Sequence, residues 1–274
     1  MRIKNIINNV KYYFKKYGFK KTIKKIISKL YTKIFKGEQL KNLQSEREKY
    51  QIWIKNNEPS EQELEEQRNT KFKIEPKFSI VVPMYNTPVN FFEELVDCLI
   101  DQTYSNWELC LADGSAEKNQ KLESIINKDS RIKYKFINEN KGISGNTNEA
   151  LTLATGDYIA LVDHDDLLPV FCLYELTKTI NENPNVEFIY TDEDKIEGIK
   201  ENRCDPHFKP DFAPDTLRAN NYITHLSVFK KELMEKLGGF REKYNGAQDF
   251  DIITRACELT KNIIHIPKVL YHWR

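Results

Sequence analysis

Three aspartates stand close together at the end of an apolar run in "ALVDHDDLLP", residues 160–169. Carboxylates this close repel one another and resist burial, unless a cation or several hydrogen-bond donors offset their charge. Asp163 and Asp165 are two positions apart, so on a continuing strand both would point to one side and His164 to the other. Two oxygen ligands on one side suit Mg²⁺ or Mn²⁺, which complete their shell with phosphate oxygens and water. The spacing therefore favours a divalent-metal site at Asp163 and Asp165.

The same run has an alternative interpretation as a cap on the helix that follows, because the helix dipole favours anions at its N-terminus. Asp166 suits that role. A cap needs one carboxylate, whereas the run holds three. We therefore expect Asp163 and Asp165 to bind metal and His164 to be structural.

A second acidic pair, Asp249 and Asp251 in "GAQDFD", lies at the start of a predicted helix. On a helix these two side chains point to different faces, so at most one of them can act as a general base at a given site. From the residues alone an acid-rich helix N-terminus explains the pair equally well.

The elements that position these acids alternate between strands and helices from residue 76 onward. Apolar, β-rich runs predict strands, and apolar residues three and four apart predict the helices between them. The expected strands are 78–83, 107–112, 132–137 and 158–162, and the expected helices begin near Pro88, run through Leu122 to Ile126, and cover 144–154 and 170–181. This alternation predicts an α/β domain with a mostly parallel sheet and helices on both faces.

Polar clusters follow each of the four strands: "PMYNTP", "DGS", "NENKGISGN" and "DHDD". Each one alone is compatible with an ordinary turn. Ligands of such sheets bind at the carboxyl ends of the strands, where all four clusters should meet. The sequence therefore predicts a polar, phosphate-binding cleft at that edge.

Residues 76–274 resemble the family-2 glycosyltransferases with the GT-A fold, in the branch that builds bacterial surface polysaccharides. The resemblance rests on an ordered series of motifs: "FSIVVPMYNTP", "DGS", "NKGISGNTNEALTLATGDYIALVDHDDLLP", "GGFREKYNGAQDFDIITRACE" and "VLYHWR". It implies a nucleotide-diphospho-sugar donor and a divalent cation, Mn²⁺ or Mg²⁺. Asp163 to Asp165 match the family's DXD motif, Asp249 its catalytic base, and His272 a histidine that completes the metal shell in some members.

The resemblance also implies which residues bind the donor, with Pro83, Tyr85 and Asp113 near the base. The full expected set is Pro83, Tyr85, Asp113, Lys141, Asp163 and Arg274. The implied reaction is an inverting displacement, in which a carboxylate takes the acceptor's proton and the metal offsets the leaving diphosphate. Two alternatives are a sugar nucleotidyltransferase, for which "VPMYNTP" lacks the Gly-rich phosphate loop, and a non-catalytic scaffold.

The segment "YTDEDKIEG" and the following residues up to 229 are less regular. In the resemblance they occupy the place of acceptor-contacting loops, so Asp192, Glu193, Asp194 and His225 are candidate acceptor or wall residues. A solvated turn explains the three acids equally well.

The charge of the chain is divided unevenly, although its net charge is only +1 over 274 residues. Residues 1–37 hold 12 Lys or Arg and no acid, so the rest holds 30 of the 42 basic residues and all 41 acidic ones. Apolar residues in 1–37 recur every three or four positions, which predicts two amphipathic helices broken near Gly18. Such helices suit an anionic membrane surface. Docking on the protein's own acidic body is the main alternative; nucleic-acid binding is the other, and we expect no such partner.

Composition limits the remaining choices. A hydrophobic fraction of 40% is ample for a packed core. Five scattered cysteines without CxxC pairing argue against a disulfide framework and a zinc site, and fit a reducing cytosol. No run reaches the length of a membrane span and no signal peptide is visible. We expect three parts: basic membrane-interface helices at 1–37, a helical connector at 38–75 and the transferase domain at 76–274. Within the connector, Ser60 followed three residues later by Glu63 predicts the start of a helix. The acceptor is expected to be a glycan or lipid-linked glycan at the inner face of the cell membrane.

Overall fold

The computed structural model describes residues 46–200 and 202–274, and the chain divides into two compact units, Met1–Asn57 and Glu58–Arg274. In the first unit the described residues 46–57 are helical. The basic helices expected at 1–37 lie outside the described residues. The second unit begins with helix α2 (Glu61–Asn69), which starts at the expected capping box of Ser60 and Glu63. The Ser60 N–H donates to the Glu63 carboxylate at 2.7 Å.

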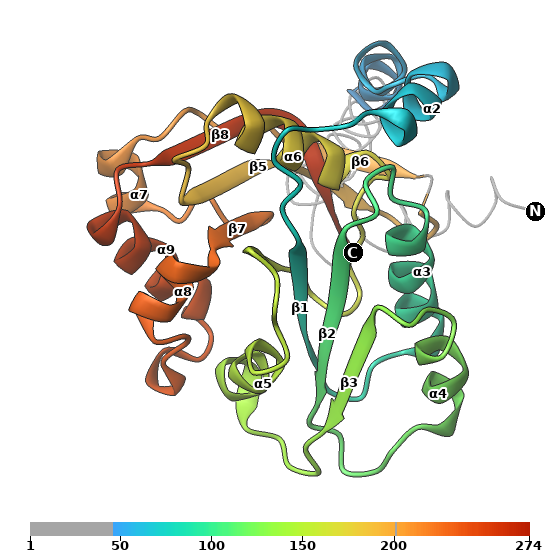
Figure 1. The fold of residues 1–274 in the computed structure, drawn as a ribbon, viewed down its shortest axis with the longest axis vertical. Helices are drawn as coiled ribbons and strands as arrows, with labels where there is room; N and C mark the ends of the chain where they lie inside the picture. Colours follow the sequence, from blue (N-terminus) through green and yellow to red (C-terminus); the bar gives the residue numbers. More distant parts are fainter. Residues whose placement is uncertain (1–45, 201) are drawn as a thin grey trace, which may run out of the picture. The chain divides into compact units, whose positions relative to one another are not determined.

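The first half of the second unit has the expected alternation of strands and helices. Its strands are β1 (Phe78–Met84), β2 (Trp107–Asp113), β3 (Ile132–Phe136) and β4 (Tyr158–Leu161). Its helices are α3 (Val89–Ile100), α4 (Gln120–Ile126), α5 (Gly142–Leu151) and α6 (Cys172–Glu182). The four strands are parallel and stand in the order β3-β2-β1-β4 (Figure 1). Their carboxyl ends therefore meet at one edge.

The second half extends the sheet with strands of mixed direction. Its strands are β5 (Phe188–Ile196), β6 (Arg203–His207), β7 (Ser227–Lys230) and β8 (Ile263–Trp273). Its helices are α7 (Pro214–Ala219), α8 (Lys231–Leu237), the 3₁₀ turn η1 (Glu242–Tyr244) and α9 (Gln248–Leu259). Strand β7 runs antiparallel to β4 and β5, whereas β8 runs parallel to β5. Within the described residues, four of the seven strand pairings are parallel.

Two hydrophobic cores lie on opposite faces of this sheet. Successive side chains of a strand point to opposite faces, and in β1 Ile80 and Val82 belong to one core while Val81 belongs to the other. Helices α3, α4 and α6 supply the first core, and α5, α8 and α9 the second. Figure 1 shows α3 and α4 on one side of β1 to β3 and α5 on the other. The predicted α/β class with helices on both faces is confirmed.

Glu108 ties the strands together near their amino ends, away from the edge where the polar clusters meet. Its buried carboxylate accepts hydrogen bonds from the Ser79 hydroxyl at 2.7 Å and the Thr155 N–H at 2.5 Å. The Lys133 ammonium lies 2.8 Å away, and the Lys77 ammonium also contacts it. Burial by itself raises the pKa of Glu108, but these lysines and the Thr155 N–H lower it well below its usual range.

Replacing Glu108 with glutamine is expected to lower the free energy of unfolding by about 2 kcal/mol at pH 7, because charge-assisted hydrogen bonds are lost. The wild-type advantage is fully present above the unfolded-state pKa of about 4.3 and shrinks as the pH falls below it. Urea titrations of both proteins between pH 7 and pH 3 measure the difference. A difference that stays constant down to pH 3 would contradict this role of the Glu108 charge.

Candidate active site

A cavity of about 320 Å³ opens at the carboxyl ends of β1 and β4. Its size lies at the lower end of the range for small-molecule sites. Its lining comes from three places: the end of β1, the start of α5 and the turn after β4. The lining residues are Pro83, Met84, Tyr85, Asn140, Gly142, Ile143, Asn146, Asp163, His164 and Asp165. Three of the four polar clusters of the sequence thus meet at one cavity.

The fourth cluster, "DGS" at 113–115, does not line this cavity but contacts the residues that form and flank its wall. The Gly114 N–H donates to the Met84 carbonyl at 2.9 Å, and the Ser115 hydroxyl accepts from the Asn86 N–H at 2.8 Å. A Cβ on Gly114 would lie 2.7 Å from Asn146 Nδ2. Glycine therefore allows the cavity wall to pack closely at this point.

The acidic turn follows β4 directly, since that strand ends at Leu161. The Asp166 N–H donates to the Asp163 carbonyl at 3.3 Å. Residues 163–166 therefore form a turn and do not continue the strand. Asp163, His164 and Asp165 all line the cavity, and the alternation expected of a continuing strand does not apply to them. A turn, unlike a strand, does not alternate its side chains between two faces.

Asp163 and Asp165 keep their carboxylates available. No described residue donates a hydrogen bond to either carboxylate; the His225 ring lies nearby, with Nε2 3.7 Å from Asp163 Oδ2. The contacts of this turn use the backbone, such as the Asp165 carbonyl, which accepts from Arg274 Nε at 2.8 Å. In the described part of the chain no three His, Cys, Asp or Glu side chains gather as a metal site. Two carboxylates fit a cation that takes its other ligands from phosphate and water.

The helix-cap interpretation of the acidic run is wrong. Helix α6 starts at Cys172, its N-cap is Phe171, and no side chain caps it. Asp166 is buried and accepts hydrogen bonds from the Tyr271 hydroxyl at 2.6 Å and the Arg274 N–H at 2.7 Å. Burial raises the pKa of Asp166 to about 7. Asp166 therefore fastens the turn to the end of β8.

His272 lies beside this turn without lining the cavity. Its backbone pairs with Leu167, and its Nδ1 lies 2.5 Å from Asp194 Oδ1. A carboxylate behind one ring nitrogen is the arrangement that orients metal-binding histidines through the other nitrogen. The role of His272 as a third metal ligand stays a prediction.

Arg274 is expected near the donor phosphates, but in this structure its charge is already paired. Its guanidinium contacts the Glu94 carboxylate and lies over the Phe91 ring, 4.2 Å from the ring centre. Lys141 is likewise engaged, with its ammonium 2.5 Å from Glu149 Oε1. Neither side chain lines the cavity.

Of the residues predicted to bind the nucleotide base, two line the cavity and one does not. Pro83 and Tyr85 line the cavity, and Tyr85 is exposed. Asp113 is buried, and its two carboxylate oxygens accept hydrogen bonds from the Ser115 N–H at 2.9 Å and the Tyr134 hydroxyl at 2.8 Å. Of the predicted donor and metal residues, the cavity therefore brings together Pro83, Tyr85, Asp163 and Asp165.

A small recess of about 20 Å³ adjoins the cavity, because Pro83, Ile143 and Asp163 line both. Asp249 and His225 also line this recess. Its volume accommodates a group of about the size of one water molecule. Burial raises the pKa of Asp249; the positive form of His225 opposes that shift, and Asp163 adds to it. A carboxylate with a raised pKa beside a cavity is suited to accept a proton.

Asp251, the other candidate base, is committed to two arginines. Arg241 and Arg255 both donate hydrogen bonds to its carboxylate, and the Nε of each arginine lies 3.0 Å from Asp251 Oδ2. Burial acts to raise the pKa of Asp251, but hydrogen bonds and charge from the two guanidinium groups lower it. Asp249, two residues earlier, instead lines the recess, and its carboxylate accepts a hydrogen bond from Gln248 Nε2 at 3.0 Å. The structure thus separates the two acids of "GAQDFD".

Sequence reasoning missed several lining residues at the start of α5, among them Asn140, Ile143 and Asn146. The helix begins at Gly142, two residues earlier than predicted, and Gly142 has φ of +71°. A Cβ there would lie 2.6 Å from Asn245 Nδ2, so glycine is needed both for its conformation and for the close packing. The "NKG" sequence before the helix was the available signal.

The acids of "YTDED" form part of a buried strand, so the solvated-turn interpretation is wrong. Asp192, Glu193 and Asp194 lie within β5 and are buried. Asp192 contacts His265 Nε2 at 2.8 Å, and Asp194 contacts Arg203 Nε at 2.6 Å as well as His272. Burial is possible because each carboxylate has a cationic or histidine partner.

Comparison with known proteins identifies the family to which this arrangement of strands and helices belongs. The family model described as glycosyl transferase family 2 matches residues 79–238, more than half of the chain. The chain belongs to this family. The family expected from the sequence motifs is therefore confirmed.

The chain is similar to two curated relatives and one solved structure. The O-antigen biosynthesis protein RfbC of Myxococcus xanthus is 29% identical over 228 residues, which cover 82% of this chain and 18% of RfbC. The Escherichia coli UDP-Glc:alpha-D-GlcNAc-diphosphoundecaprenol beta-1,3-glucosyltransferase WfgD is 33% identical over 112 residues, 41% of this chain and 44% of WfgD.

The solved structure is that of S. aureus TarS, residues 1–349, in complex with UDP. It superposes with a TM-score of 0.61 at 20% identity and covers 72% of this chain and 60% of that one. This likeness confirms the GT-A fold. The chain spans less than half the length of either curated relative.

Proposed function

We propose that this chain is an inverting, metal-dependent glycosyltransferase that moves a sugar from a nucleotide-diphospho-sugar to a glycan or lipid-linked glycan of the cell surface. The observation that carries the proposal is the junction at Asp163. This residue lines both the larger cavity, which it shares with Asp165, and the recess that contains Asp249. A metal-binding pair and a candidate base thus meet at one point.

The larger cavity is the proposed donor site. Tyr85 and Pro83 offer apolar surface for a base, and the N-terminus of α5 contributes Gly142 and Ile143 to the wall. A helix N-terminus attracts the negative charge of a diphosphate. The UDP in the complex of TarS is consistent with such a donor.

Asp163 and Asp165 would hold Mg²⁺ or Mn²⁺ there, with His272 as a further ligand. Their carboxylates have no hydrogen-bond donors among the described residues, which leaves their lone pairs for a cation. When bound, the cation offsets the charge that develops on the leaving diphosphate.

Asp249 is the proposed general base. An acceptor hydroxyl that reaches the recess gives its proton to the Asp249 carboxylate as its oxygen bonds to the anomeric carbon. The bond from that carbon to the diphosphate breaks on the opposite face, so the anomeric configuration inverts. The base must lie within hydrogen-bond reach of the hydroxyl, and the small volume of the recess limits what else can enter.

The direct test is release of nucleoside diphosphate from a panel of UDP-, dTDP- and GDP-sugars with Mn²⁺ present. We expect one donor to be hydrolysed slowly and the reaction to stop when EDTA removes the metal. A panel in which no donor reacts, with or without an added glycan, would contradict the proposal. Thermal-shift binding of the same panel identifies the preferred nucleotide.

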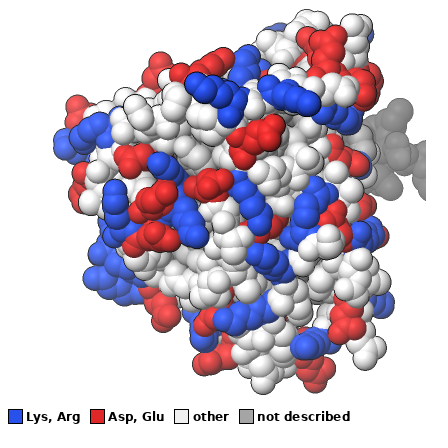
Figure 2. Space-filling view, viewed as in Figure 1, with Lys and Arg blue, Asp and Glu red and all other residues white. Residues whose placement is uncertain are grey.

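Residues 1–37 are the proposed attachment to the inner face of the cell membrane. Among the described residues, no helix has both the length and the apolar character needed to cross a bilayer. Docking of the basic helices on an acidic surface of the protein is the rival proposal. On the face drawn in Figure 2, acidic and basic side chains are interspersed and form no continuous acidic surface. The O-antigen role named for RfbC is consistent with an acceptor at a membrane.

Deleting residues 1–37 is expected to reduce co-sedimentation with liposomes containing 30% phosphatidylglycerol by about tenfold or more, because twelve cations contribute electrostatic attraction. Liposomes of phosphatidylcholine alone serve as the control for charge. Binding to anionic liposomes that is unchanged by the deletion would exclude these residues as the attachment.

A further inference from the structure

His225 has a feature that the proposed mechanism does not explain: a buried ring nitrogen without a partner. Its side chain is 7% exposed and lines the recess together with Asp163 and Asp249. Nδ1 is buried and has no hydrogen-bond partner among the described residues. Nε2 lies 3.7 Å from Asp163 Oδ2, which is too far for a hydrogen bond. Buried polar atoms are nearly always paired, so the ring of a recess-lining histidine with no hydrogen-bond partner is a candidate for contact with a ligand.

The imidazole ring is held in place by two aromatic residues of β8. It stacks on Tyr271 with a centroid distance of 4.9 Å and an interplanar angle of 15°. Trp273 packs edge-on against it at 5.4 Å. The ring is therefore fixed before any substrate arrives, which lowers the entropy lost when it forms a hydrogen bond.

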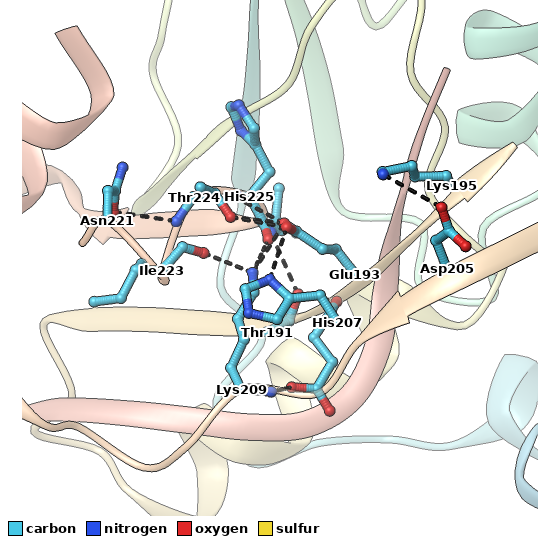
Figure 3. Close-up of polar contacts among 12 residues, drawn as sticks. Thr191, Glu193, Lys195, Asp205, His207, Lys209, Asn221, Ile223, Thr224 and His225 are labelled. Carbon is cyan, nitrogen blue, oxygen red and sulfur yellow. Dashed lines mark hydrogen bonds and ion pairs between the residues drawn. The ribbon is translucent and has the colours of Figure 1, made fainter. Parts of the chain in front are cut away.

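The backbone of His225 is held by a buried lysine and glutamate. Lys209, whose side chain is 0% exposed, donates from Nζ to the His225 carbonyl, and to the Ile223 carbonyl at 2.6 Å. The same ammonium lies 2.9 Å from Glu193 Oε2. Glu193 in turn accepts from the His225 N–H at 3.3 Å and from the Thr224 hydroxyl at 2.8 Å. Figure 3 shows these side chains converging on the segment that carries His225.

The chemistry of the recess indicates what the His225 ring can bind there. Ionised Asp163 and Asp249 can only accept hydrogen bonds, so a hydroxyl that donates to Asp249 still needs a donor for its oxygen. A neutral imidazole carries an N–H on one of its ring nitrogens, and this N–H can donate to the oxygen of such a hydroxyl. The volume of about 20 Å³ admits one such group.

We propose that His225 is a substrate-binding residue whose ring nitrogen hydrogen-bonds a sugar hydroxyl in the recess, and that Lys209 with Glu193 positions it. The inference rests on the proposed function, because it takes a sugar as the ligand. The hydroxyl belongs to the transferred sugar or to the acceptor sugar, and the two sources share this chemistry.

Three replacements of His225 separate the hydrogen bond from the packing. Phenylalanine keeps an aromatic ring between Tyr271 and Trp273 but has no nitrogen. Asparagine and glutamine place an amide nitrogen near the positions of Nδ1 and Nε2. We expect His225→Phe to lower kcat/KM by about 100-fold, as sites that bind a substrate hydroxyl do when the bond is lost. At least one amide variant should recover tenfold of that loss.

The assay uses the sugar nucleotide that the wild type hydrolyses fastest and has two arms. One arm follows hydrolysis, with water as acceptor; the other follows transfer to a panel of p-nitrophenyl glycosides. Loss in both arms assigns the hydroxyl to the transferred sugar, and loss in the second arm alone assigns it to the acceptor. Activity of His225→Phe within twofold of wild type in both arms would overturn the inference. Equal losses in all three variants would do so too, because packing alone would then explain them.

Lys209→Met tests the positioning role, with Lys195→Met as a matched control. Lys195 of β5 pairs with Asp205 of β6 at 3.5 Å, and both side chains are exposed. At a temperature where all variants are folded, we expect Lys209→Met to lower kcat/KM about tenfold, and the control to match wild type. Combined with His225→Phe, the lysine change should add little, because both act through one contact. Losses that simply multiply would refute the positioning role.

The failure of this inference differs from that of the proposed function. If the wild type releases nucleoside diphosphate from no donor, both are wrong. If the wild type is active and His225→Phe is equally active, only the inference is wrong.

Discussion

Replacing Asp165 with asparagine is expected to lower Mn²⁺-dependent release of nucleoside diphosphate by about 10³-fold, which corresponds to about 4 kcal/mol of transition-state stabilisation. The reason lies in the free carboxylates: Asp163 and Asp165 line the cavity, and no described residue donates a hydrogen bond to them. An amide removes one negative charge from the pair, so the cation binds less tightly. The variant should also need a higher Mn²⁺ concentration for half-maximal activity.

The same change at Asp163 should have an effect at least as large, because this residue borders the recess as well. A suitable control is Asp97→Asn on α3, where an exposed carboxylate pairs with Lys128. The control should keep wild-type activity and metal dependence. If Asp165→Asn retained activity within threefold of wild type at low Mn²⁺, the metal site would have to lie elsewhere.

Asp249→Asn is expected to lower the rate of sugar transfer by about 10³-fold while leaving the affinity for the sugar nucleotide unchanged. The effect of removing a general base falls in the range of about 10²- to 10⁴-fold. Donor affinity should be unchanged because Asp249 lines the recess and not the larger cavity. Transfer rates under saturating donor and a binding titration with the nucleotide measure the two quantities separately.

Asp251→Asn provides the matched comparison, two positions along the same helix. It leaves Arg241 and Arg255 without their shared carboxylate, so it should lower the melting temperature. Transfer at a temperature where the variant is folded should remain within a fewfold of wild type. The opposite result, with Asp251→Asn inactive and Asp249→Asn active, would reverse the assignment of the base.

The two predictions concern separate steps of one reaction. The metal pair acts on the leaving diphosphate, whereas Asp249 acts on the incoming hydroxyl. Hydrolysis and transfer should therefore both fail in the Asp165 variant. Donor binding should survive in the Asp249 variant.

The sequence by itself determined the parts of this protein that depend on local patterns. Strand and helix periodicity predicted β1 to β4 and the helices between them, and Ser60 with Glu63 predicted the start of α2. These features can be predicted from sequence because neighbouring residues determine the backbone hydrogen bonds and the buried face of each element. Parallel strands also bring their carboxyl ends to one edge, so the position of the cavity followed from the same pattern.

Only the tertiary structure decided which side chains in that region are free and which are paired. Asp166 contacts Tyr271, Asp194 contacts His272 and Arg274 contacts Glu94. These contacts span 78 to 180 residues of the chain, and no local pattern connects residues so far apart. Asp249 and Asp251 look alike in sequence, yet one lines the recess and the other holds two arginines. The burial of Asp192 to Asp194 and the unpaired nitrogen of His225 arose in the same way. The availability of a polar group depends on where the fold places every other polar group around it.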